Sequence, residues 1–367
     1  MYLVIKPQDT LFFRSGRPFT MGAETWADCI FPPSPSTFYG ALRAFLIFER
    51  ADLVKFLKNE KVEGIFEDIG TPKEKGSLKI CGEFVYNEKL QAIYFPIPAD
   101  LVKSKHKQKN KLLRLSLEKK PDYIYSDYPL EMCLFFKENE KIEEAFGFID
   151  NLFLKDYLEG KTEEIPFIEM EKILSLEPKI GIKREPITKT SEEEHIYRIQ
   201  MIRLKEDFGF LLKIEGVKNL PEKGVLQLGG EGKLAEFKVL KEEVLKDLEN
   251  IQFSLKDGIF KLYFATSAIF KNGWLPEGVK EDYTWEINGL KLKLVAVALK
   301  KHKLLGGWDM AENKPKPMYR VVPEGSVYYF KVLNGADEEK IKEVFHFKNI
   351  SDILPEEGFG LTLVGGV

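Results

Sequence analysis

Residues 285–300, WEINGLKLKLVAVALK, carry the clearest indication of the fold class in this sequence. Apolar residues alternate around Asn288-Gly289, a dipeptide that favours the two-residue turn of a β-hairpin because both residues tolerate positive φ. The segment is therefore predicted to form two antiparallel strands. Antiparallel strands mixed with helices favour an α+β structure, with helices on one face of the sheet, over the strict βαβα order of a doubly wound sheet.

The residues around this hairpin repeat the same mixture of strands and helices. Alternating or continuous apolar runs predict strands, and apolar residues at helical spacing predict helices. The predicted strands are residues 2–7, 78–86, 91–97, 131–137, 259–270, 326–335 and 361–366, and the predicted helical stretches lie within 139–159, 241–249 and 337–347.

The segment FPPSPSTFYGALRAFLIFERADLVKFL, residues 31–57, predicts the longest helix. Its prolines exclude a regular element before the helix. Ser36 or Thr37 is the predicted N-cap of a helix that runs to about residue 58. One broad apolar face is predicted from Phe38, Leu42, Phe45, Leu46 and Phe48.

A second hairpin is predicted in the middle of the chain. HIYRIQMIRL (195–204) and FGFLLKIEG (208–216) both read as strands and are separated only by KED. The glycine- and proline-containing segment GIKREPITKTSEEEHIYR (181–198) is predicted to be irregular. Each half of the chain thus contains one predicted antiparallel pair.

Length and element order divide the chain into two predicted domains. At 367 residues the chain exceeds one compact core of ordinary size. An N-terminal ferredoxin-like domain with insertions is predicted over residues 1–250, and a C-terminal ferredoxin-like domain with a glycine-rich loop over residues 251–367. Two such RRM-like domains in tandem, with long loop insertions, form the predicted fold, and the exposed face of such a sheet is a platform for RNA.

The composition excludes several classes of protein. A hydrophobic fraction of 44% excludes general disorder. No apolar run reaches the roughly 18 residues of a membrane helix, and the N-terminus lacks a signal-peptide pattern. Three widely spaced cysteines, Cys29, Cys81 and Cys133, indicate neither a disulfide framework nor a zinc site, so a reducing cytoplasm is the predicted location.

Positive charge is concentrated in two segments, although the net charge is −3. KSKHKQKNK (103–111) and KLKLVAVALKKHK (291–303) each contain five lysines and no acidic residue. The first of them lacks apolar periodicity and is predicted to be a loop. Binding responds to local potential more than to net charge, so nucleic acid remains a candidate partner.

Four loops combine glycine with cationic residues. Glycine lets the backbone approach a phosphate closely, and arginine or lysine supplies the charge. The first loop, DTLFFRSGRPF (9–19), contains the adjacent Phe12 and Phe13, of which one is predicted to point to the core and one outward. An ordinary turn is the simpler interpretation of any single loop, but the repetition favours a surface that binds phosphates and bases. The other three loops are residues 181–198, 228–237 and 301–326, and a fifth glycine-rich segment, 358–366, has no cation.

Motifs for catalysis are missing from the sequence. GGEGK lacks the spacing of a P-loop, and there is no HExxH or GxSxG sequence. His106 and His302 lie in lysine-rich segments, where an imidazole could act as the general base of a metal-independent ribonuclease. The alternative is that they simply belong to a phosphate-binding surface. His195 is predicted to be structural, and His346 to be a packed surface residue.

Taken in order, six segments resemble the third Cmr subunit of type III-B CRISPR effector complexes, a Cas5-like family of the RAMP superfamily. They are DTLFFRSGRPF, FPPSPSTFYGALR, GIKREPITKTSEEEHIYR, LGGEGKLAEF, GGWDMAENKPKPMYRVVPEGSVYYF and the terminal GFGLTLVGG. The resemblance implies a non-catalytic RNA-binding subunit of an antiviral complex that holds the repeat-derived 5′ tag of the CRISPR RNA. It also implies contacts with the large polymerase/cyclase-like Cmr subunit and with backbone RAMP subunits, and no cofactor or metal.

The same resemblance assigns RNA contacts to the four glycine-and-cation loops. Two other functions stay open: a RAMP-type metal-independent endoribonuclease that processes precursor CRISPR RNA, and a scaffold whose glycine loops are structural. Since the whole protein is slightly acidic, RNA binding is expected within an assembly that covers its other faces. The assigned residues are Arg14 and Arg17, then Lys183, Arg184 and Lys189, then Gly229, Gly230, Gly232 and Lys233, and finally Lys314, Lys316 and Arg320.

Overall fold

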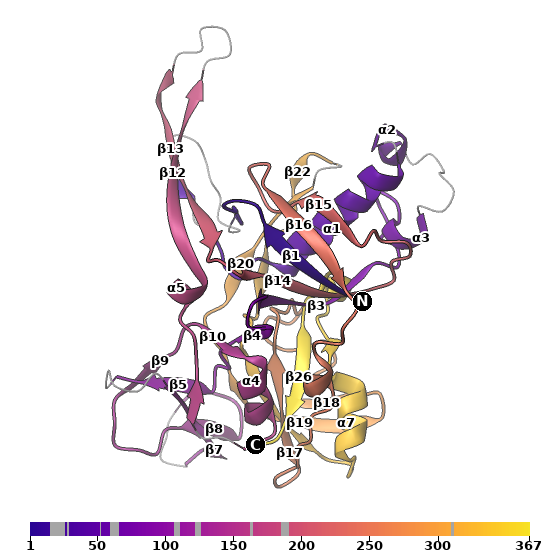
Figure 1. Ribbon diagram of the computed structural model, residues 1–367. Helices are drawn as coiled ribbons and strands as arrows, with labels where there is room; N and C mark the ends of the chain where they lie inside the picture. Colours follow the sequence, from indigo (N-terminus) through magenta and orange to yellow (C-terminus); the bar gives the residue numbers. More distant parts are fainter. Residues whose placement is uncertain are drawn as a thin grey trace. The chain divides into compact units, whose positions relative to one another are not determined.

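The computed structural model of the chain is rich in β-sheet and contains few helices (Figure 1). This mixed composition agrees with the predicted α+β class. No helix among the described residues is long and apolar enough to cross a membrane. The structure describes residues 1–14, 26–27, 29–51, 53–58, 66–105, 111–121, 126–161, 164–184, 191–309 and 312–367.

The chain forms two compact units, each assembled from three separate segments of sequence. The first consists of Met1–Lys89, Glu171–Lys241 and Leu304–Arg320. The domain boundary predicted from the sequence, between residues 250 and 251, stays a prediction. The second unit consists of Leu90–Met170, Glu242–Lys303 and Val321–Val367.

The first unit is built on an antiparallel sheet around the N-terminal strand. β1 (Tyr2–Pro7) lies between β14 (Phe208–Glu215) and β16 (Leu234–Leu240), which confirms the strand predicted at residues 2–7. β3 (Lys79–Asn87) adds to the outer side of β14 and β15 (Lys223–Gln227) to that of β16. Along the chain β1 leads through α1 to β3, and β14 lies between these two strands, so the unit contains a split βαβ.

The helix α1 (Pro35–Arg50) covers this sheet and is shorter than predicted. Ser34, not Ser36 or Thr37, is its N-cap, because Pro35 supplies a fixed φ and no N–H at the first helical position. The helix ends before the extended Ala51, and a separate α2 (Leu53–Leu57) follows. Phe38 and Phe45 pack edge-on against Phe210 and Phe237 of the sheet, whereas Phe48, predicted on the same face, is exposed.

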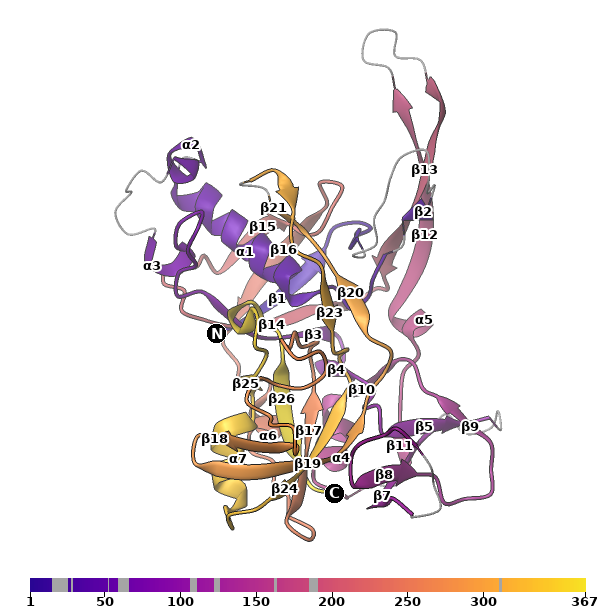
Figure 2. The same cartoon turned by 180° about the vertical axis from the view of Figure 1, so that it is seen from behind.

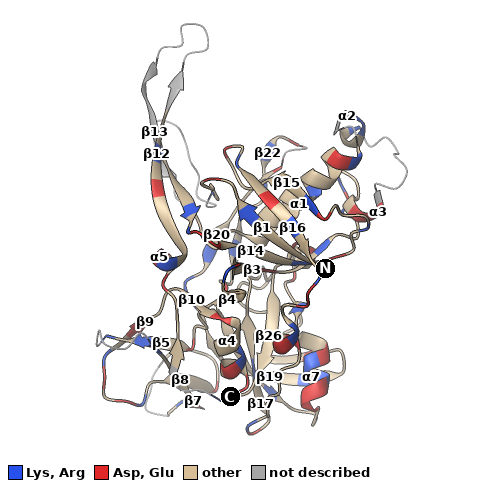
Figure 3. Cartoon of the chain, viewed as in Figure 1, with Lys and Arg blue, Asp and Glu red and all other residues tan. Residues whose placement is uncertain are grey.

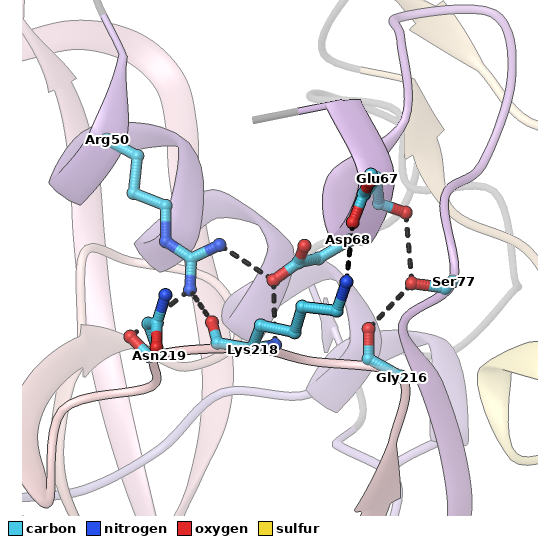
Figure 4. A network of polar contacts seen from close by, with 7 residues as sticks. All are labelled: Arg50, Glu67, Asp68, Ser77, Gly216, Lys218 and Asn219. Carbon is cyan, nitrogen blue, oxygen red and sulfur yellow. Dashed lines mark hydrogen bonds and ion pairs between the residues drawn. The ribbon is translucent and has the colours of Figure 1, made fainter. Parts of the chain in front are cut away.

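A network of polar contacts holds the end of α1 to the loop between β14 and β15 (Figure 4). Arg50 Nη1 lies 2.7 Å from Asp68 Oδ2 in the short α3 (Phe66–Ile69), and the same carboxylate oxygen accepts a hydrogen bond from Lys218 N at 3.0 Å. The Asp68 side chain is almost completely buried. On the surface above it, Lys218 Nζ pairs with Glu67 Oε2 at 2.8 Å.

A long two-stranded arm, formed by β12 (Leu174–Arg184) and β13 (Ser191–Leu204), belongs to the first unit (Figure 1). The short α5 (Met170–Ile173) precedes it, and β2 (Trp26–Ala27) pairs with β13 in parallel. The hairpin predicted between residues 195–204 and 208–216 is wrong. The turn that closes with Phe208 N donating to Lys205 O directs the chain from the arm into the central sheet, where β14 pairs with β1 and β3.

The segment predicted to be irregular, residues 181–198, is correspondingly strand on both sides of its middle. Arg184 pairs with Ser191 across the arm. Residues 185–190 lie outside the described residues. The prediction failed because the polar composition of this segment resembles a loop, while cross-strand pairing supplies the order that composition does not indicate.

The second unit contains a six-stranded antiparallel sheet and confirms the Asn-Gly hairpin. β18 (Thr284–Ile287) and β19 (Leu290–Ala298) pair around Asn288 and Gly289, whose φ values are 44° and 82°. β24 (Val327–Val332) leads through α7 (Glu338–Phe345) to β26 (Leu361–Gly365). The strand order is β18, β19, β24, β17 (Ile259–Phe264), β26 and β25 (Lys348–Asn349), which makes β24–α7–β26 a second split βαβ around β17.

The remainder of the second unit surrounds α4 (Asn151–Leu158). Only this part of the helical region predicted within residues 139–159 is helix, because Ile142–Glu144 pairs as β9 with β5 (Leu101–Ser104). The predicted strands at 91–97 and 131–137 are confirmed. The other elements are β4 (Ala92–Pro96), β6 (Lys111–Arg114), β7 (Ser116–Lys119), β8 (Met132–Phe135), β10 (Phe148–Asp150), β11 (Glu164–Pro166), α6 (Lys246–Glu249) and η1 (Pro355–Glu357).

A cluster of buried polar side chains lies in the core of the second unit. The Asp100 carboxylate, fully buried, accepts hydrogen bonds from the hydroxyls of Tyr157 (2.7 Å) and Tyr329 (2.6 Å). Lys261 Nζ lies 3.5 Å from the centre of the Tyr157 ring and donates to the Tyr157 carbonyl, which also accepts from Arg114. Burial, reinforced by the nearby Arg114 charge, holds the pKa of Lys261 well below its usual value.

Candidate nucleic-acid interface

The first glycine-and-cation loop is fixed between two β-layers of the first unit. Leu11 exchanges backbone hydrogen bonds of 2.7 and 2.8 Å with Ile202 of β13. Phe12 packs with β13 residues, and the Phe13 ring lies edge-on to Phe210 of β14 with centres 6.3 Å apart. Phe12 and Phe13 do point different ways, but both are buried, so the prediction that one points outward is wrong: protein covers both faces of this segment.

Arg14 follows these phenylalanines at the surface. Its backbone forms a β-bridge with Cys29, and its side chain is exposed. Phe13 N also donates to Cys29 Sγ at 3.0 Å, which ties this stretch to the chain entering α1. Arg14 is therefore held at a defined position on the surface, while Arg17 lies outside the described residues.

The third loop, the GGEG turn (Gly229–Gly232), packs directly on the first. Gly230 N donates to Phe12 O at 2.9 Å. Gly229 has φ +77°, and a Cβ there would lie 2.5 Å from the same carbonyl oxygen, so glycine is required for this approach. Gly232 also has positive φ, but open space surrounds it. The two glycines that touch Phe12 thus have a structural reason to be glycine, and Gly232 is the one next to open surface.

Lys233 is paired with an acidic residue of the first loop. Its Nζ lies 2.9 Å from Asp9 Oδ2, and Arg203 of β13 donates to Asp9 Oδ1 at 3.0 Å. The hydrogen bond from Lys233 is the main cause that lowers the pKa of Asp9 to about 2, so Asp9 is negatively charged at neutral pH. A phosphate that binds Lys233 would have to compete with this carboxylate.

These contacts bring two of the four predicted loops, the first loop and the GGEG turn, together at the base of the arm. Arg203 also pairs with Glu177 of β12, and Lys179 Nζ lies 3.1 Å from Glu231 Oε2 of the GGEG turn. The charges alternate in sign along this chain of pairs. Asp9, Glu177 and Arg203 were missed by the sequence analysis, because their partners lie far away in sequence and no spacing rule links them.

Two of the predicted contacts in the second loop belong to the part of β12 that lies away from the base of the arm. Lys183 and Arg184 belong to β12, about 13 Å or more beyond Lys179 at the usual rise per residue. Lys189 lies outside the described residues. The arm therefore separates these predicted contacts from the cluster at its base.

The fourth loop forms a narrow hairpin of its own (Figure 2). β20 (Lys303–Leu305) pairs with β23 (Tyr319–Val321), and β21 (Trp308–Asp309) with β22 (Lys314–Pro315). The predicted contacts Lys314, Lys316 and Arg320 are all exposed. Lys314 pairs with Glu312. Trp308, about half exposed, lies on this hairpin and was not predicted from the sequence to bind RNA.

The lysine-rich segments are less basic in the folded protein than in the sequence. Lys103 Nζ lies 3.3 Å from Glu169 Oε1, Lys293 pairs with Glu131, and Lys303 with Glu324. Lys300 is largely buried, and burial lowers its pKa. Figure 3 shows basic and acidic residues interspersed over both units. The concentration of positive charge predicted from the sequence is thus partly neutralised by acidic residues from other segments.

The histidines and cysteines among the described residues show no activated arrangement. His346 is buried, contrary to the prediction of a surface position: its Nε2 lies 2.8 Å from Leu248 O and its Nδ1 accepts from Val364 N, so it joins three elements of the core. Burial raises the pKa of the Cys29 and Cys81 thiols to about 11. No group of His, Cys, Asp or Glu side chains in the described segments is arranged to hold a metal ion.

Comparison with known proteins shows that this fold occurs in solved structures. Two solved structures contain a similar chain: the cryo-EM structures of the Type III-B Cmr-beta bound to cognate target RNA, with and without AMPPnP. Each match has a TM-score of 0.50 and 16% identity and covers 90% of this chain and 86% of the other, so it shows a shared fold. A search of curated protein sequences gives no match.

The family itself is shown by the sequence. A family model described as CRISPR-associated protein (Cas_Cmr3) matches residues 3–366. The chain therefore belongs to the CRISPR-associated Cmr3 family, and the resemblance found in the six sequence segments is confirmed.

Proposed function

We propose that this chain is the RNA-binding subunit of a type III-B CRISPR-Cas (Cmr) complex, an RNA-guided, RNA-targeting effector in the cytoplasm. In this role it holds the 5′ tag of the CRISPR RNA, without catalysis, and bridges the large polymerase/cyclase-like subunit to the RAMP backbone. Membership of the Cmr3 family supports the assembly. The observation that carries the binding role is the packing of the first loop, the GGEG turn and the base of the arm into one cluster.

This cluster favours a binding surface with a fixed backbone and cationic side chains beside it. The approach of Gly229 and Gly230 to Phe12 fixes the turn, which leaves Gly232 beside open space. Arg14, which belongs to the first loop with Phe12, lies at the surface. Peptide N–H groups and a guanidinium group are the usual ligands of an RNA phosphate. Lys233 and Arg203 hold the loops in place through Asp9, and RNA contact by Lys233 requires exchange of that partner.

The two split βαβ units support the tandem ferredoxin-like domains that we propose for residues 1–250 and 251–367. In each unit a helix connects two strands, and one further strand lies between these two in the sheet, which is the core of a ferredoxin-like fold. β1–α1–β3 encloses β14, and β24–α7–β26 encloses β17. The sheet of the first unit then forms the support for the loop cluster.

Replacement of both Arg14 and Arg17 by alanine is expected to weaken capture of tag-bearing RNA by the assembled complex. Affinity for a single strand falls with salt, and each lost phosphate contact reduces the magnitude of the slope of log K against log salt by about 0.7. The loss of two contacts should therefore reduce it by roughly 1.4. The measurement is RNA affinity of the reconstituted complex at several salt concentrations. The matched control replaces Lys238 and Lys241, two exposed lysines of the same unit, by alanine. Equal slopes for the arginine variant and the wild type would refute the assignment.

The non-catalytic part of the proposal predicts that the complex leaves repeat RNA intact. Labelled repeat RNA incubated with the purified complex without metal should stay uncut at the repeat. His302 is exposed, and His106 lies outside the described residues. Cleavage that disappears in His106→Ala or His302→Ala would instead establish the endoribonuclease.

A further inference from the structure

The exposed indole of Trp308 is not explained by packing within the described protein. Trp274 stacks on Tyr283 and Trp285 is buried, whereas Trp308 is 49% exposed and makes no ring or cation contact with another described residue. Its two preceding residues are Gly306 and Gly307, which have no side chains to cover the ring. A single exposed apolar residue is common on protein surfaces, so a role for Trp308 has to follow from the residues around it.

The hairpin around Trp308 has chemically different faces. Residues that pair across antiparallel strands lie on the same face, so Trp308 shares one face with its partner Pro315. Asp309 and Lys314 form the next pair and occupy the opposite face. Lys316 belongs to that opposite face as well, because its N–H bonds to Gly307 O and its Cδ would lie 3.3 Å from a Cβ on Gly307.

Basic residues outnumber acidic residues on and beside the face that carries Asp309 and Lys314. Lys314 is paired with Glu312, and Asp309 accepts a hydrogen bond from Glu312 N. Lys316 and Arg320 are exposed further along the same strand segment. The ribbon is only two strands wide, about 5 Å between strand axes. A group that rests on the aromatic face can therefore reach the cationic face around the edge of the ribbon.

We infer that Trp308 stacks on an unpaired base of single-stranded RNA, while Lys316 and Arg320 bind the adjoining phosphates. This inference rests on the proposed function and assigns the base-stacking part of it to one residue. A flat aromatic ring with cations on the opposite face of the same narrow ribbon matches the two features of a nucleotide, its base and its phosphate. The base must belong to a single strand, because a base within a helix is stacked between its neighbours and has no free face. A protein partner fits less well, since Pro315 is the apolar residue paired with Trp308, and the exposed Lys316 and Arg320 follow it along the chain.

The test compares Trp308→Ala, Trp308→Phe and Met318→Ala in the reconstituted complex, with single-stranded tag-bearing RNA as the probe. Stacking on one base is worth about 1–3 kcal/mol, so Trp308→Ala should weaken binding by about 5-fold to about 150-fold. Its salt slope should stay unchanged, because no phosphate contact is lost, whereas Lys316→Gln should lower the slope by about 0.7. Trp308→Phe should recover most of the affinity, and Met318→Ala, equally exposed at 49%, should bind within about twofold of the wild type.

The outcomes separate this inference from the proposed function. If the wild-type complex does not bind tag-bearing RNA, both fail. If it binds and Trp308→Ala binds equally well, the inference alone is overturned and the proposed function stands. If Trp308→Ala loses a protein subunit from the complex while the remaining assembly keeps its RNA affinity, the indole is a protein contact and the inference is again overturned.

Discussion

Asp100→Ala is expected to lower the free energy of unfolding of the second unit by about 3–5 kcal/mol. The carboxylate is fully buried and is the acceptor for the hydroxyls of both Tyr157 and Tyr329. Without it these hydroxyls lose their partner in the core, and Lys261 loses the nearby opposite charge that raises its pKa. Each unsatisfied buried group costs about 1–3 kcal/mol.

Native-state hydrogen exchange of the amides in β17 and β24 measures this loss without assuming that the whole chain unfolds in one step. Asp100→Asn keeps one acceptor oxygen and should lose less stability. The exposed Asp127→Ala is the matched control and should change exchange by less than about 0.5 kcal/mol. A loss from Asp100→Ala as small as that of the control would show that the cluster is not a significant source of stability.

Asp68→Ala should have the second largest effect, a loss of about 2–3 kcal/mol in the first unit. Its carboxylate bonds both Arg50 and the backbone N–H of Lys218, so its removal leaves Arg50 Nη1 and a peptide N–H without this partner, although Arg50 Nη2 still donates to the Lys218 and Asn219 carbonyls (Figure 4). We place the value below that of a fully buried pair because the Arg50 side chain is 19% exposed and can be partly hydrated.

The neighbouring ion pair provides the control for this prediction. Glu67 and Lys218 are 70% and 76% exposed, and removal of such a pair typically costs less than about 1 kcal/mol. Chemical denaturation of Glu67→Ala and Asp68→Ala side by side should therefore show a clear shift only for Asp68. Equal shifts would mean that the buried contacts of Asp68 add no more to the free energy of unfolding than an exposed ion pair does.

The sequence was most informative where the structure is decided locally. The Asn288-Gly289 hairpin follows from the positive φ that both turn residues adopt, and the N-terminal strand follows from its alternation. The hairpin predicted between residues 195 and 216 failed because two strands adjacent in sequence pair in different sheets. Local spacing does not reveal that choice, which depends on β12 and β1.

The candidate site was predictable only in its parts. Glycine and cation patterns identified the first loop and the GGEG turn, but not their direct packing. That packing depends on Phe12 O receiving Gly230 N, and on Asp9 receiving Lys233, across more than 200 residues of sequence. For the same reason Lys233 looked like a free cation in the sequence and is a paired one in the structure.

The interleaving of the two units has a consequence for synthesis of the chain. The first unit is complete only when three segments have been made: Met1–Lys89, Glu171–Lys241 and Leu304–Arg320. At about 5–20 residues per second, a ribosome takes roughly 10–40 s to pass from Lys89 to Leu304. At the start of that interval β1, α1 and β3 have been made, but their partner strands β14 and β16 have not. The hairpin formed by β20 to β23 is missing until the interval ends. A nascent chain therefore exposes unpaired strand edges for seconds, and we expect chaperone binding at this stage to influence how much of the subunit reaches the complex.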